Sequence, residues 1–134
     1  MPFLVHPLVV HFPVALWLTS ALFDVLYLRS GDRGHLRASQ WLVGLGLLGA
    51  AASVVSGYVD YLPLVAQGIG QTFVAQHRVH QLVAGAATVV YLASFLARWR
   101  RPALSRTAFV VLTVVGAVLI AATGYVGGEL RRVM

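Results

Sequence analysis

The chain is 134 residues long, 59% hydrophobic and only 10% charged, and its formal net charge is +6. Soluble domains have about 25% charged residues, so this composition excludes an ordinary soluble protein and indicates a membrane protein. The sequence contains no cysteine. This excludes disulfides, thiolate metal sites, cysteine-held iron–sulfur clusters and covalently attached c-type haem, so any cofactor needs histidine or oxygen ligands.

Four apolar segments are long enough to cross a hydrocarbon core, which requires about 20 helical residues. They cover residues 8–28, 41–59, 79–98 and 107–126. The predicted fold is therefore all-α, an integral membrane four-helix bundle that forms a single domain over residues 1–134.

Small residues and helix breakers mark the second segment and the connection after it. Gly49, Ser53 and Gly57 recur every four positions, which predicts a close-packing helix face. The connection over residues 60–76 is expected to be a broken segment along the outer surface because of its turn residues. These are Pro63, Gly68 and Gly70.

Arginines are concentrated between the first and second apolar segments and between the third and fourth. The two groups are Arg29, Arg33 and Arg37, and Arg98, Arg100, Arg101 and Arg106. Arginine-rich loops face the cytoplasm, so both termini and the connection between the second and third segments are expected outside. Arg131 and Arg132, near the C-terminus, oppose this orientation, but the seven loop arginines outnumber them. Asp24 is expected to pair with a loop arginine near the cytoplasmic boundary. The N-terminus lacks a basic region, so no cleaved signal peptide is expected.

The orientation can be tested with topology reporters. Fusions at Arg33 and Ala103 are expected to report the cytoplasm, because both positions lie in the arginine-rich loops. Reporter activity measured in whole cells checks this, and a periplasmic signal from either fusion would contradict the orientation.

The first apolar segment opens with the motif His6-Pro7-Leu8-Val9-Val10-His11-Phe12-Pro13. Histidine is costly at membrane depth, so these two histidines are functional candidates. Proline is tolerated in the first turn of a helix. A helix that begins near Pro7 would place His11 one turn in and would be kinked at Pro13. A helix that begins near Pro13 would leave both histidines on the entry loop, and the sequence does not decide between the two.

The two halves of the chain show a weak internal repeat. An offset of 69 residues aligns His11 with His80, and an offset of 67 aligns Gly57-Tyr58-Val59 with Gly124-Tyr125-Val126. Each half would then be a helix pair, and the two pairs would be related by a pseudo-two-fold axis along the membrane normal.

Under this repeat, His11 and His80 would face each other at the outer ends of the first and third helices. Two histidines without other strong donors suit the axial positions of a haem iron. His77 lies near His80 and His6 near His11, so the four histidines could instead form a zinc or copper site. A third interpretation is a cofactor-free structural anchor for a redox partner. No nucleophile lies beside a base, so an electron carrier is favoured over an enzyme.

Three motifs together resemble the DUF2231 family of small bacterial four-span membrane proteins. They are His6-Pro7-x-x-x-His11-Phe12-Pro13, Gly57-Tyr58-Val59-Asp60 and Gly124-Tyr125-x-Gly127-Gly128-Glu129-Leu130. The family is similar in topology to small b-type cytochromes, and some members look fused to, or placed beside, Rieske iron–sulfur domains.

The resemblance implies a multi-pass protein of the bacterial cytoplasmic membrane, and the histidines predict one or two bound haem b groups. It also implies electron transfer with a partner such as a Rieske-type protein or a quinone. A homodimer is a further arrangement that we consider. The family pattern of a histidine followed four residues later by an amide falls on His77 and Gln81, whereas the repeat selects His80.

Overall fold

The computed structural model describes residues 5–100 and 104–130, and this part of the chain is all helix without strands. The helices are α1 (His6–Val9), α2 (His11–Ser30), α3 (Arg33–Ala66), α4 (Gln71–Arg100) and α5 (Arg106–Leu130). In the described residues, α1 with α2 and each of the other three helices are long and apolar enough to cross a membrane. The predicted all-α, four-span architecture is confirmed.

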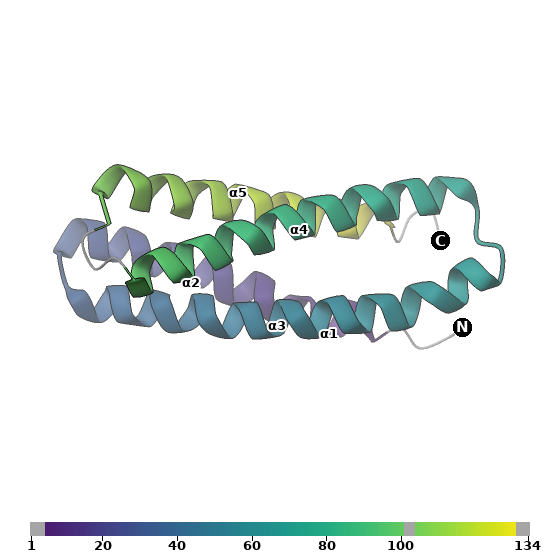
Figure 1. The fold of residues 1–134 in the computed structure, drawn as a ribbon, viewed down its shortest axis with the longest axis horizontal. Helices are drawn as coiled ribbons and strands as arrows, with labels where there is room; N and C mark the ends of the chain where they lie inside the picture. The colour runs from purple at the N-terminus through teal and green to yellow at the C-terminus, as the bar shows by residue number, and fades with distance from the viewer. Residues whose placement is uncertain (1–4, 101–103, 131–134) are drawn as a thin grey trace.

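The helices form an elongated antiparallel bundle (Figure 1). The α2–α3 turn, the last residues of α4 and the first residues of α5 lie at one end, and the α3–α4 turn lies at the other end, where α1 begins and α5 finishes. Helix α2 packs beside α3 and α5, and α4 packs beside the same two helices. In the described residues α2 and α4 have no close backbone contact, so they occupy opposite corners of the bundle.

The first helix begins at His6 and is interrupted once, at Val10. Pro13 has no N–H to donate to a carbonyl four residues earlier, so the helical ladder is broken there. The structure therefore has the first of the two arrangements that the sequence left open, with Pro7 in the first turn and His11 one turn in. Helix α2 is capped at its C-terminal end by Gly31, which has a φ of 71°. The Gly31 N–H donates to the Tyr27 carbonyl at 2.8 Å.

Helices α3 and α4 are longer than expected, and the predicted loop over residues 60–76 is wrong. Helix α3 continues through Pro63 to Ala66, and α4 begins at Gln71, leaving a turn in which Gly68 has a φ of 80°. The two extensions are joined by aromatic packing, with the rings of Tyr61 and Phe73 stacked 6.4 Å apart. This tertiary contact favours helix where the turn residues alone indicate a break.

The core is built on a central aromatic stack. Trp17 of α2 and Tyr91 of α4 lie with ring centres 4.1 Å apart and planes within 10°. Each ring packs against a glycine of a neighbouring helix, Trp17 on Gly46 and Tyr91 on Gly116. Lateral space for two large rings therefore comes from glycines on α3 and α5.

The buried positions recur between the halves at offsets other than those predicted. Each buried position of α2 has a counterpart with a buried side chain in α4 that lies 74 residues further along the chain. The same separation relates Asp24 to its ion-pair partner Arg98. The pairs are Pro13 and Ala87, Trp17 and Tyr91, Ser20 and Ser94, and Asp24 and Arg98. In α3 and α5 the pairs are Ser39 and Phe109, Val43 and Thr113, Gly46 and Gly116, Ala50 and Ile120, and Ser53 and Thr123. The register with offsets of 69 and 67 is therefore not the one that the packing follows, and the pseudo-two-fold axis itself stays a prediction.

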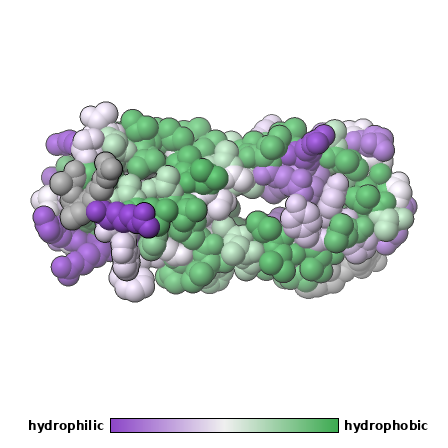
Figure 2. All heavy atoms as spheres, viewed as in Figure 1, coloured by the Kyte–Doolittle hydropathy of each residue, from purple (hydrophilic) through white to green (hydrophobic). Residues whose placement is uncertain are grey.

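Large apolar side chains cover the outside of the bundle. Phe12, Trp41, Leu48, Trp99 and Tyr125 are each about 70% exposed. Figure 2 shows this apolar surface along the middle of the molecule, with polar side chains gathered toward the ends. A soluble monomer rarely exposes so much apolar area, so these faces contact lipid and the protein is an integral multi-pass membrane protein.

Candidate functional site

Three histidines come together at the end of the bundle opposite the arginine-rich loops. The ring of His6, from α1, lies 6.2 Å from the ring of His80, from α4, with the planes nearly perpendicular at 84°. The ring of His77, also from α4, lies 6.3 Å from that of His80. We call His6, His77 and His80 the histidine cluster.

His6 is held by three contacts with α3. Its backbone N–H donates to Asp60 Oδ2 at 2.7 Å, and its Nδ1 lies 2.8 Å from the Ser53 carbonyl oxygen. A carbonyl can only accept, so Nδ1 carries the proton and Nε2 is left with a free lone pair. Gly57 makes room for the ring, because a Cβ atom there would lie only 3.2 Å from it.

His80 has a corresponding setting on the other half of the bundle. Its ring packs on Gly127, where a Cβ atom would lie 3.0 Å away. The ring faces the main chain of Thr123, yet its buried Nδ1 makes no full hydrogen bond among the described residues. His6 and His80 are separated by the same 74 positions that relate the buried residues of α2 and α4. The two histidines are therefore at corresponding sequence positions under this 74-residue offset.

His77 has a different environment from the other two members. Its ring stacks on Tyr61, with centres 4.1 Å apart and planes within 6°, and lies 5.7 Å from the ring of Phe73. These partners belong to the extensions of α3 and α4, where a broken loop was expected. No signal in the sequence pointed to Tyr61 or Phe73.

The other two histidines lie outside the cluster. His11 is exposed at the start of α2, although we expected it to face His80. Five residues advance a helix by about 140°, so His11 points away when His6 points inward. His35 lies at the arginine-rich end, with its Nδ1 3.1 Å from Ser30 Oγ.

The described residues do not assemble a multi-ligand metal site. In residues 5–100 and 104–130, no group of three or more His, Asp or Glu side chains is placed to hold one metal ion. Structural zinc prefers a closed set of four such ligands. The histidine cluster instead offers one facing pair of imidazoles, with the third ring engaged in aromatic stacking.

One protein-family model matches almost the whole chain. Residues 2–134 match the family model described as "Predicted membrane protein (DUF2231)". The chain belongs to the DUF2231 family. No curated protein and no solved structure gives a significant match to it. In this DUF2231 protein, the opening family motif supplies His6 and the Gly57-containing motif supplies the surface on which His6 rests.

Proposed function

We propose that this DUF2231 protein is a b-type cytochrome-like electron carrier that binds haem b through His6 and His80. The single observation that supports this most strongly is the close approach of the His6 imidazole, from α1, to the His80 imidazole, from α4. Two imidazoles whose ring centres lie about 6 Å apart would be close enough to hold one metal ion between them. The separation here is 6.2 Å.

The surroundings of the two rings fit metal ligation. A ligating histidine usually donates its other ring N–H to a carbonyl or carboxylate, which fixes the tautomer and the ring orientation. His6 has this arrangement through Ser53, and the buried Nδ1 of His80 faces Thr123 without a full hydrogen bond. Figure 2 also shows the bundle hollowed near its middle, beside the polar side chains of this half.

The donor set indicates the type of chemistry. Bound haem would supply a one-electron redox centre, and two histidine ligands would leave its iron without an open position for oxygen. The protein's own part is to orient two imidazoles and to surround them with apolar helices. This favours a carrier over an oxygen-activating enzyme.

The pair accounts for one haem. A second haem would need His77 and a further ligand, whereas His77 is stacked between aromatic rings and His11 is exposed. Tyr61 and His77 lie at the end of the bundle, so this end is where we expect a redox partner, a Rieske-type protein or a quinone, to approach. A homodimer could form through the exposed apolar faces without involving the site.

Four histidine variants test the haem proposal. Protein expressed with ample haem supply is expected to show a Soret band and a low-spin reduced-minus-oxidised spectrum. His6→Ala and His80→Ala should each lose most of the bound haem, because one axial ligand is removed and no cysteine can replace it. His11→Ala and His35→Ala are the matched controls, and both should retain the wild-type haem content and spectrum.

Different results would overturn the proposal in recognisable ways. Folded wild-type protein with no Soret band but a stoichiometric zinc or copper content would favour a metal site. Loss of haem in His11→Ala together with retention in His6→Ala would restore the pairing expected from the sequence. Folded protein with neither haem nor metal would leave only a structural role.

A further inference from the structure

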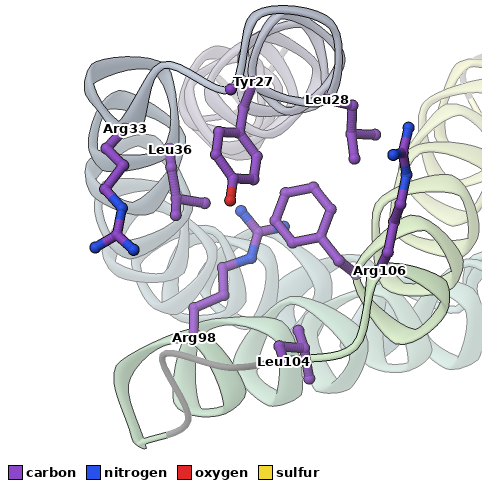
Figure 3. A pocket seen from close by; sticks show the side chains of 9 residues that line it. Tyr27, Leu28, Arg33, Leu36, Arg98, Leu104 and Arg106 are labelled. Carbon is purple, nitrogen blue, oxygen red and sulfur yellow. The ribbon is translucent and has the colours of Figure 1, made fainter.

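A second hollow lies at the opposite end of the bundle from the histidine cluster. It is a cavity of about 370 Å³, formed where α2 ends, α3 and α5 begin and α4 finishes. Its lining includes three arginines and several leucines (Figure 3). We call this cavity the arginine pocket, and the residues used below are Tyr27, Arg33, Leu36, Arg98, Leu104 and Arg106.

Arg98 forms the floor of the arginine pocket. Its side chain is only 6% exposed, and its two terminal nitrogens bind Asp24, each at 2.8 Å. Its Nε is buried and has no hydrogen-bond partner among the described residues. Figure 3 shows the guanidinium reaching toward the hydroxyl of Tyr27. The floor therefore offers N–H and O–H donors to an acceptor in the pocket.

Arg33 and Arg106 flank the pocket as unpaired charges. Within the described part of the chain, neither side chain has an ion pair. They are the first residues of α3 and α5. A cation at a helix N-terminus is disfavoured by the helix dipole, so these two arginines do not serve helix stability. The helix N-termini themselves are capped, that of α3 by the Asp32 carboxylate and that of α5 by the Ser105 hydroxyl. The charges of Arg33 and Arg106, on opposite sides of the pocket in Figure 3, are therefore what favours an anion there.

The apolar part of the lining indicates what kind of anion. Leu36 and Leu104 lie beside the arginines, and the pocket sits where the membrane spans end. Basic pockets between transmembrane helices on the arginine-rich side bind the head groups of anionic lipids. We propose that the arginine pocket binds the phosphate of an anionic phospholipid, with the leucines against its glycerol and upper acyl region. This proposal is independent of haem binding.

Binding of phosphatidylglycerol to purified protein in a zwitterionic detergent tests the proposal. Native mass spectrometry is expected to detect a bound phosphatidylglycerol that phosphatidylcholine at equal concentration does not displace. The double variant Arg33→Gln/Arg106→Gln should weaken its binding by about thirtyfold, since two arginine contacts are lost. Arg29→Gln/Arg37→Gln is the matched control, with the same loss of charge from the first arginine-rich loop, and it should bind within about twofold of wild type. Arg106→Gln alone, expected to cost about fivefold, serves if the double variant is unstable.

Three outcomes would overturn the proposal. Equal weakening in both double variants would mean that diffuse surface charge attracts the lipid. Binding of inorganic phosphate as tight as that of phosphatidylglycerol would mean that the pocket takes a soluble anion. Equal affinity for phosphatidylcholine would mean that the head-group charge is not recognised.

Discussion

Replacing Asp24 with alanine is expected to lower the free energy of unfolding by about 3–5 kcal/mol, which is the cost of leaving a buried charge without its partner. Asp24 is 1% exposed and accepts from both terminal nitrogens of Arg98. Its Oδ2 also accepts from the Thr113 hydroxyl at 2.7 Å. The guanidinium left behind would keep the Ser39 hydroxyl at 2.8 Å, a long contact with the Thr113 hydroxyl at 3.5 Å and the face of Phe109 at 4.5 Å, with no charged partner.

A double variant separates the charge effect from a simple loss of packing. Asp24→Leu/Arg98→Met removes both charges and should recover most of the stability, because a buried pair can be replaced by apolar side chains at little cost. Arg100→Ala, an exposed arginine on the same helix, should be silent. Thermal unfolding in mild detergent, followed by circular dichroism, measures all three. A stable Asp24→Ala protein would show that the pair does not hold the helices together.

The four spans and this ion pair were predictable from the sequence because both follow from the membrane environment. A long apolar run has few alternatives to a spanning helix. An acid inside such a run needs a basic partner, and loop arginines were available to Asp24. The small-residue face of α3 was predictable for a similar reason and is confirmed, since Gly49 packs on Pro13 and Gly57 on His6.

The register between the halves was not predictable because the paired positions hold complementary residues. Trp17 corresponds to Tyr91 and Asp24 to Arg98, and each pair meets across the bundle. An alignment that rewards identical residues cannot find such pairs, and it matched His11 with His80 and Gly57-Tyr58-Val59 with Gly124-Tyr125-Val126 instead. That choice put His11 in the place that His6 occupies.

The histidine cluster was predictable in part. The motifs predicted that the site would consist of histidines and would lie at the end of the bundle opposite the arginine-rich loops. His77 and His80, both predicted, are present in the cluster. Which face of the first helix pointed inward depended on where that helix began. The prolines of the opening motif allow two starts, so only the packed structure separates His6 from His11.

The second large effect is expected at Gly46, where alanine should lower the free energy of unfolding by about 1–3 kcal/mol through overpacking. A Cβ atom on Gly46 would overlap the indole of Trp17 at Nε1, Cδ1 and Cε2. The indole cannot move aside easily, because its Nε1 donates to the Val43 carbonyl at 3.2 Å and its ring is stacked on Tyr91. Trp17 is also only 2% exposed, so no open space adjoins it.

The glycines of α4 and α5 supply graded controls for this prediction. A Cβ atom on Gly116 would lie 3.0 Å from Tyr91, so Gly116→Ala should cost less than Gly46→Ala. Gly85 has nothing within 4 Å of an added Cβ, and Gly85→Ala should raise stability slightly because alanine favours helix by about 1 kcal/mol over glycine. Adding Trp17→Leu to Gly46→Ala should restore part of the loss, since the smaller side chain leaves room for the methyl group. If the Trp17 ring rests directly on Gly46, the melting temperatures in mild detergent should rise from Gly46→Ala through Gly116→Ala to Gly85→Ala. Equal melting temperatures for Gly46→Ala and Gly85→Ala would contradict this packing.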